Sequence, residues 1–328
     1  MAGETPQGIG ALSLFLRDLG PPRSKPSLFR QSKQFSHVLV VSDPQIKNPA
    51  IAPSWISSFL TALDNLLFDL HLKKSWHFAM HFKPHHVIFL GDMTASGRRA
   101  VSDEEWVPFF VRCFLRLIFV SIYAFRYGAY YETFTRMFPI PLKEATPHYL
   151  PGNNDVGLNM DPIESQHARR RFTKHFGPLD QTVVIQNHTL VLLDASRIIE
   201  EDYRRLRGGP NHEFPKDGTM SFVGSLSPGS LLILAKSVWR LRHSFSFCVG
   251  VKAHPAILFT HIPLFRPDAA SCGPLRESGT IRRGAGPNYQ STIGKDVSAF
   301  LLDHLRPAMV FRSANIPTHH EMLTLTGG

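Results

Sequence analysis

The stretch His86-Val87-Ile88-Phe89-Leu90-Gly91-Asp92 decides the fold class of this chain, because a short apolar run ends directly on a glycine and a carboxylate. An apolar run of strand length without alternation is typical of a strand that is buried on both faces. Runs of the same kind occur at residues 37–42, 148–150, 256–260 and 308–311. The sequence therefore predicts a set of buried strands, most of which are followed closely by polar residues.

Helical patterns separate these strands. Residues 56–72 carry apolar side chains at helical spacing, and Ser102-Asp103-Glu104-Glu105 is a capping box that predicts a helix from Ser102. Strands that alternate with helices indicate an α/β layered fold. The remaining predicted elements are helices around residues 169–174 and 231–241 and a hairpin of residues 182–185 and 190–193.

Composition limits the class of protein. Of the 328 residues, 43% are hydrophobic and 19% are charged, a balance that excludes a mostly disordered chain. The formal net charge is +10, from 36 basic and 26 acidic residues, and it favours an anionic partner such as nucleic acid, a phosphorylated substrate or a membrane surface. No RNP, zinc-finger or helix-turn-helix pattern is present, so no nucleic acid is expected as a partner.

The chain divides into three parts. Residues 1–34 form a polar segment that is predicted to be disordered, residues 35–311 form one domain, and residues 312–328 form an atypical tail. The strongest candidate for a membrane span is residues 107–123, but Arg112 and Arg116 favour a buried or surface-lying helix there. No clear transmembrane or signal segment is therefore predicted.

Candidate metal ligands follow four of the strands. They are Asp43 and Gln45, then Asp92, then Asn153 with Asn154 and Asp155, and then His261. The carboxyl edge of an α/β sheet is where ligands bind, and oxygen and imidazole donors suit Mn²⁺, Fe or Zn²⁺. Each residue by itself is more typical of a helix cap or a turn than of a metal ligand. The ordered set points to a metal site.

The order of these motifs resembles that of the calcineurin-like metallophosphoesterases. The matching motifs are Asp43-Pro44-Gln45, Gly91-Asp92, Gly152-Asn153-Asn154-Asp155 and Thr260-His261. A narrower resemblance, to the branch that removes ethanolamine phosphate from glycosylphosphatidylinositol (GPI) anchors and that includes the cell-division-control type, is carried by other motifs. These are Asp43-Pro44-Gln45-Ile46, residues 260–267 and 272–277, and Ser102-Asp103-Glu104-Glu105-Trp106.

The resemblance implies a layered β-sandwich flanked by helices, incomplete at its C-terminal end, and a centre with two divalent metal ions, manganese foremost. By the same resemblance, Asp92 bridges both ions, Asp43 and Gln45 hold the first, and Asn153 and His261 hold the second. It also implies a substrate that is a GPI glycolipid or a GPI-anchored protein, association with a membrane, and a location in the endoplasmic reticulum or early secretory pathway.

Two departures from the family pattern bear on activity. Asn154 stands where the family has a histidine, and an amide cannot act as a general acid at neutral pH. Asn154 and Asp155 are nevertheless the candidate catalytic residues, with Asp155 expected to orient a neighbour. The final Gly-His-x-His motif is absent after Phe311, and His319 and His320 lie in what is expected to be a mobile tail.

The leading hypothesis is a metal-dependent phosphodiesterase of GPI remodelling, intact or impaired by the loss of the final motif. The alternatives are a generic metallophosphoesterase that acts on nucleotides or phosphoproteins, and a catalytically silent fold that binds GPI-anchored cargo or lipid. On charge alone, a basic nucleic-acid-binding protein is the remaining alternative.

Overall fold

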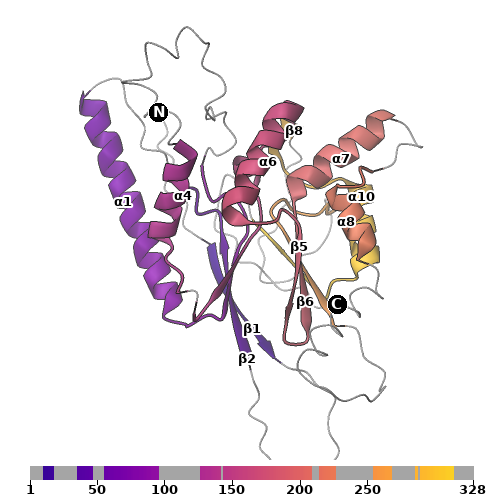
Figure 1. Ribbon diagram of the computed structural model, residues 1–328, viewed down its shortest axis with the longest axis horizontal. Helices are drawn as coiled ribbons and strands as arrows, with labels where there is room; N and C mark the ends of the chain where they lie inside the picture. The colour runs from indigo at the N-terminus through magenta and orange to yellow at the C-terminus, as the bar shows by residue number, and fades with distance from the viewer. Residues whose placement is uncertain are drawn as a thin grey trace, which may run out of the picture.

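The computed structural model describes residues 10–17, 35–46, 55–95, 126–141, 143–208, 214–226, 254–267, 285–286 and 289–313. In this part of the chain, two four-stranded sheets lie between helices (Figure 1). The predicted helices at Ser102 and at residues 231–241 fall outside the described residues.

The first sheet has the strand order β1-β2-β3-β4. Its strands are β1 (Gly10–Arg17), β2 (Phe35–Ser42), β3 (His86–Phe89) and β4 (Thr146–Tyr149). β2, β3 and β4 are parallel, and β1 pairs antiparallel with β2 at the edge. The carboxyl ends of the three parallel strands therefore lie at one edge of the sheet.

The second sheet has the order β10-β7-β6-β5 and the same plan. Its strands are β5 (Gln181–Ile185), β6 (His188–Leu193), β7 (Ala256–Thr260) and β10 (Met309–Arg312). β6, β7 and β10 are parallel, while β5 forms an antiparallel hairpin with β6. A separate two-stranded ribbon consists of β8 (Ala285–Gly286) and β9 (Tyr289–Gln290).

Helices cover the outer face of each sheet. The long helix α1 (Trp55–Met80), α4 (Arg126–Met137) and the end of α6 (Pro162–Phe176) share a core with the first sheet. Short α5 (Asn153–Val156) leads from β4 towards α6. On the other side, the second sheet packs against α7 (Ala195–Gly208), α8 (Thr219–Ser225) and α10 (Lys295–Leu305).

The two sheets meet face to face in a third core. Val40 and Ile88 of the first sheet belong to the same buried cluster as Leu192, Phe259 and Phe311 of the second. The rings of Phe259 and Phe311 stack with their centroids 5.0 Å apart. Strands buried on both faces need apolar residues at every position, which explains why the runs in the sequence do not alternate.

The α/β class and the predicted strands agree with the structure, and the hairpin is confirmed as β5 and β6. Helices α7 and α10 were not predicted, although both carry amphipathic patterns. Within the segment expected to be disordered, residues 10–17 form β1, whose backbone groups find partners on the edge of β2. The division of the chain into three parts stays a prediction. Within the described residues, no helix combines the length and the hydropathy that a bilayer crossing requires.

Candidate metal centre

The parallel strands bring the predicted ligands to one place. Asp43 directly follows β2, and Asp92 lies three residues after the end of β3. Asn153 is the first residue of α5, which follows β4. His261 directly follows β7 of the second sheet, so the site lies where the carboxyl edges of both sheets meet. The placement depends on strands from both sheets and not on any single loop.

The ligand atoms are close enough to share a cation. One carboxylate oxygen each from Asp43 and Asp92 and one ring nitrogen of His261 lie within 4.8 Å of one another. His261 Nε2 lies 3.4 Å from Asp92 Oδ1 and 3.0 Å from Asn153 Oδ1. Four of the five predicted metal residues therefore converge.

The orientation of His261 suits a metal ligand. Its Nδ1 lies 2.7 Å from the carbonyl oxygen of Leu90, and because a carbonyl only accepts, Nδ1 carries a proton and donates. Nε2 faces Asp92 Oδ1 and Asn153 Oδ1, which also only accept, so it donates a proton towards them, and a bound cation would displace that proton. Histidine ligands in metal sites are generally oriented by this kind of hydrogen bond to the second ring nitrogen.

Gln45 joins the site through its backbone. Its N–H donates to the carbonyl oxygen of Asp92 at 2.9 Å, and its side chain is half-buried. The role of the Gln45 side chain as a ligand stays a prediction. Asp43, Gln45 and Asp92 all have positive φ, at 51°, 40° and 51°, a conformation that non-glycine residues adopt uncommonly and that tends to cluster at functional sites.

Asp92 is fixed by the turn after β4. The backbone N–H of Asn154 donates to Asp92 Oδ1 at 2.8 Å, and the Asn154 side-chain amide donates to Asp92 Oδ2 at 2.6 Å. A Cβ on Gly152 would overlap Asp92, so only glycine allows this approach. Asn154, one of the candidate catalytic residues, is therefore placed as a clamp on the Asp92 carboxylate.

Asp155, the other candidate catalytic residue, lies fully buried below the ligands. Its carboxylate accepts hydrogen bonds from the backbone N–H groups of Gly152, Met93 and Thr94, at 3.0, 3.3 and 3.1 Å, and from the Thr94 hydroxyl at 3.2 Å. These bonds connect the loop after β3 to the loop after β4. The arrangement agrees with an orienting residue, and a part in the chemistry remains a prediction.

Charge is concentrated in this centre. Burial raises the pKa of Asp92, and the neighbouring Asp43 acts in the same direction. Burial alone would lower the pKa of His261, but the Asp92 and Asp43 carboxylates outweigh it and raise that pKa above its ordinary value. Burial and the charge of Asp92 raise the pKa of Asp155 to about 7. The carboxylates repel one another, and a bound cation would relieve that repulsion.

One oxygen of Asp43 is left for a ligand. Its Oδ2 accepts hydrogen bonds from the hydroxyls of Ser42 and Ser313, whereas Oδ1 is buried and has no partner among the described residues. An unpartnered buried carboxylate oxygen next to a second carboxylate and an imidazole nitrogen fits a divalent cation. The residues present thus fit the metal ion that the sequence predicts, and its identity stays a prediction.

Sequence reasoning missed the serines. Ser313 lies within the stretch set apart as an atypical tail, yet it is 1% exposed, and its backbone N–H donates to the carbonyl oxygen of His261 at 3.2 Å. The signal was its position directly after β10, at the same carboxyl edge. His319 and His320 lie outside the described residues.

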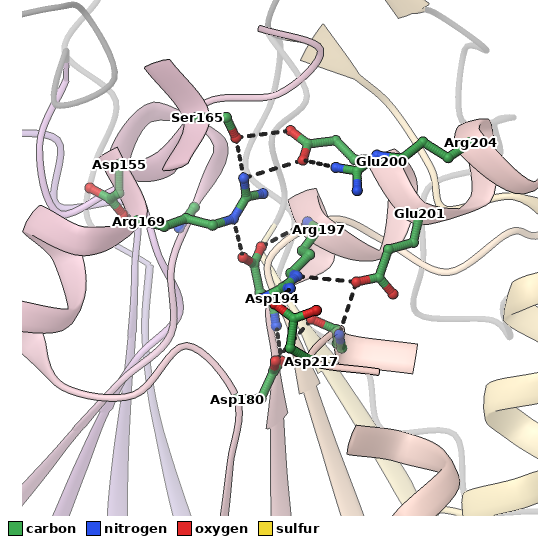
Figure 2. A network of polar contacts seen from close by, with 12 residues as sticks. Asp155, Ser165, Arg169, Asp180, Asp194, Arg197, Glu200, Glu201, Arg204 and Asp217 are labelled. Carbon is green, nitrogen blue, oxygen red and sulfur yellow. Dashed lines mark hydrogen bonds and ion pairs between the residues drawn. The ribbon is translucent and has the colours of Figure 1, made fainter. Parts of the chain in front are cut away.

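A second polar cluster, also missed, occupies the next position along this edge (Figure 2). Asp194 follows β6 one residue beyond the Leu193–Thr260 pair, as His261 follows β7. Arg169 of α6 contacts Asp194 at 3.1 Å and Glu200 at 3.2 Å. The cluster is therefore an ion-pair network beside the metal centre.

The network continues towards α8. Arg197 contacts Glu201 and the exposed Asp217, both at 3.1 Å, and Glu201 also accepts from the N–H groups of Thr219 and Met220 at 3.0 Å. Asp180 accepts from the Asp194 N–H at 2.8 Å and from the Thr219 hydroxyl at 2.9 Å. Burial, with the charge of Asp194, raises the pKa of Asp180 to about 7.

Comparison with known proteins supports the resemblance read from the motifs. The chain is similar to Cell division control protein 1 of Saccharomyces cerevisiae, with 27% identity over 279 residues that make up 82% of this chain. The predicted resemblance to the cell-division-control type is thereby confirmed. The matched part spans 44% of the length of the yeast protein. No family model matches the chain.

Proposed function

We propose that this protein is a metal-dependent phosphoesterase and, more specifically, a phosphodiesterase that removes ethanolamine phosphate from a GPI glycan. The observation that carries the proposal is the convergence of Asp43, Asp92 and His261 from three strands of two sheets within 4.8 Å. Two acidic oxygens and an imidazole at one sheet edge are a donor set for a divalent cation, and phosphoester hydrolysis is a reaction that such cations promote.

The residues divide the work between holding and orienting. Asp43, Asp92, Asn153 and His261 would hold the metal, which when bound supplies Lewis acidity towards the phosphoryl oxygens and activates water for attack. Asn154 keeps the Asp92 carboxylate in place through its two hydrogen bonds. Ser42 and Ser313 do the same for Asp43.

Position 154 offers no general acid to protonate the leaving group. The family pattern places a histidine at this position, where it can protonate the departing alkoxide. The amide of Asn154 cannot act as a general acid at neutral pH, so this source of the proton is missing. The reaction should therefore depend strongly on the leaving group. Diesters with acidic leaving groups should turn over measurably, whereas alkyl diesters should be slow.

The GPI substrate rests on sequence resemblance. The motifs at residues 260–267 and 272–277 and the similarity to the yeast protein support it. With that substrate, the partner is a GPI glycolipid or GPI-anchored protein, the metal is a pair of manganese ions, and the location is the membrane of the endoplasmic reticulum or early secretory pathway.

A second candidate is a catalytically silent relative that binds GPI-anchored cargo. The amide at position 154 favours it, because the site would then retain metal ligands without a proton donor. This candidate differs from the first in turnover and not in metal binding.

The test combines manganese titration by calorimetry with hydrolysis of bis(4-nitrophenyl) phosphate and 4-nitrophenyl phosphate by the full chain. We expect saturable manganese binding and a preference for the diester, both lost in Asp92→Asn and kept in Asp217→Asn, whose carboxylate is exposed. Metal binding without turnover would favour the silent relative. Absence of metal binding would overturn both.

A further inference from the structure

The outer face of α1 is apolar without a described partner in the core. Its row of leucines has exposed fractions of 43% for Leu63, 54% for Leu66, 59% for Leu67 and 53% for Leu70. The opposite face of the helix already fills the core of the first sheet. Figure 1 shows α1 as the outermost element on its side of the molecule. A helix whose outer face is also apolar exposes hydrophobic surface to water, and such surface is typical of a contact with a partner.

The same face becomes basic towards the end of the helix. Lys73, Lys74 and His77 are exposed, and they are followed by Phe78 and Phe82, whose exposed fractions are 68% and 50%. Cationic and aromatic side chains are therefore both exposed at this end of the helix. Such a mixture is typical of helices that lie at the boundary between lipid headgroups and acyl chains.

A cleft of about 450 Å³ opens beside this face, between α1 and the end of α4. Lys73, His77 and Arg136 line it together with Trp76, and Glu144 is the acidic residue in its wall. Leu66, Leu70, Lys73 and His77 are spaced by four, three and four residues, which places them on one strip of the helix. The leucine row therefore runs directly into a cleft with cationic walls.

We propose that this face, defined by the leucine row and the cleft, docks on an anionic lipid surface. The leucines would enter the acyl boundary, and Lys73 and Arg136 would contact headgroup phosphates at the cleft. Apolar surface alone would fit any partner, but an apolar row that ends at paired cations fits lipid, whose apolar and anionic parts are layered in the same order. The net charge of +10 acts in the same direction. The inference goes beyond the proposed phosphoesterase activity and does not depend on the metal centre.

Cosedimentation of the full chain with vesicles tests the proposal. We expect binding to vesicles of phosphatidylcholine with phosphatidylserine, and much weaker binding to phosphatidylcholine alone. Lys73→Ala should weaken binding about fivefold, the effect of one cation near an anionic surface. Lys174→Ala, which removes an exposed lysine from α6, should leave binding unchanged. An equal loss of vesicle binding in both variants would show that binding depends only on the net charge of the protein, and it would overturn the proposal.

Leu66→Ser combined with Leu70→Ser tests the apolar row. We expect a loss of about tenfold or more in vesicle binding, with an unchanged melting temperature, because these side chains are exposed in the free protein. Leu302→Ser on α10, an exposed leucine away from this face with an exposed fraction of 43%, is the control and should bind normally. A large fall in melting temperature would show that the leucine row packs within this chain. A dimer of the unmodified chain that the variant dissociates would show that a second copy covers the row. Either result overturns the proposal. Asp92→Asn should bind vesicles normally, which separates this inference from the proposed activity.

Discussion

Two polar clusters lie side by side at the carboxyl edge of the sheets, and they differ in how their charge is balanced. In the metal centre, the ring of His261 lies against the negative charge of Asp43 and Asp92. In the network around Asp194, the side chains of Arg169 and Arg197 contact the carboxylates at 3.1–3.2 Å. The partner of the carboxylates is therefore an imidazole in the first cluster and a guanidinium in the second.

The difference separates a structural cluster from a binding cluster. Guanidinium groups stabilise buried carboxylates by pairing with them, as Arg169 pairs with Asp194 and Glu200 in the second cluster (Figure 2). Where pairing is missing and a carboxylate oxygen stays unpartnered, an external cation can complete the site. Variants that remove a charge should thus affect metal binding in the first cluster and stability in the second.

The largest expected effect is on metal binding. Asp92→Ala should abolish manganese binding, because it removes the buried charge that lies closest to both His261 and Asn154. Gln45→Ala should retain measurable binding, since a neutral amide contributes at most one weak oxygen ligand. Elemental analysis after dialysis measures both. Equal metal loss in the two variants would contradict the central place of Asp92.

In the network, the expected effect is on stability. Arg169→Met leaves Asp194 and Glu200 buried without their shared cation, which should cost about 3–5 kcal/mol in the free energy of unfolding. Arg204→Met is the control: this side chain is 56% exposed and lies 3.7 Å from Glu200, so its loss should cost about 0–1 kcal/mol. Urea denaturation measures both. Similar costs would mean that burial does not distinguish the two arginines.

The network should also respond to pH through Asp180. Its pKa is raised to about 7 in the folded chain by burial and by Asp194, so between its unfolded pKa and pH 7 the folded state holds a proton that the unfolded state has lost. Stability from this group is full at low pH and is lost as the pH rises through 7, by roughly 2 kcal/mol between pH 5.5 and 8.

Asp180→Asn should flatten that part of the stability profile, because an amide does not titrate. Asp217→Asn should not, since backbone hydrogen bonding and Arg197 lower the pKa of Asp217 and keep it ionised across this range. Thermal unfolding at a series of pH values provides the comparison. An unchanged slope in Asp180→Asn would assign the pH response to another group.

A smaller effect is expected at Ser313. Ser313→Ala removes one of the two hydroxyl donors that orient Asp43, and the loss of a hydrogen bond worth about 1 kcal/mol should weaken manganese binding about fivefold. Ser196→Ala, at another fully buried serine, should leave the affinity unchanged. Calorimetric titration would detect the difference, and identical affinities would exclude an orienting role for Ser313.

The smallest effect is expected from the tail. A chain that ends at Ser313 keeps the Asp43 contact and should bind manganese within about twofold of the full chain, since His319 and His320 are not expected to contribute. A tenfold loss, about 1.4 kcal/mol, would show that these histidines reach the centre and complete the metal-ligand set.

Much of the centre was readable from local pattern. The apolar runs predicted β3 and β7, and the residues after them, Asp92 and His261, were identified as candidate ligands before any geometry was known. This succeeds because buried parallel strands need continuous apolar residues, and their carboxyl ends share an edge. The helix α7 was not predicted, although Ile198 and Ile199 mark its buried face.

Contacts between distant segments were beyond the sequence. Ser313 reaches Asp43 across 270 residues, and Arg169 pairs with Asp194 because α6 crosses the end of β6. β1 likewise has order because β2 presents an edge to it. None of these has a periodic signal, since each depends on how separate elements are packed.

The sequence by itself determined the alternation of strands and helices and the identity of the residues at each strand end, because side-chain periodicity and turn chemistry act over a few residues. The tertiary structure decided that His261 of the second sheet faces Asp92 of the first, and that Arg169 pairs with Asp194. The physical reason is that charge balance in a buried site depends on which side chains lie within a few ångströms, and that proximity is set by the packing of the two sheets.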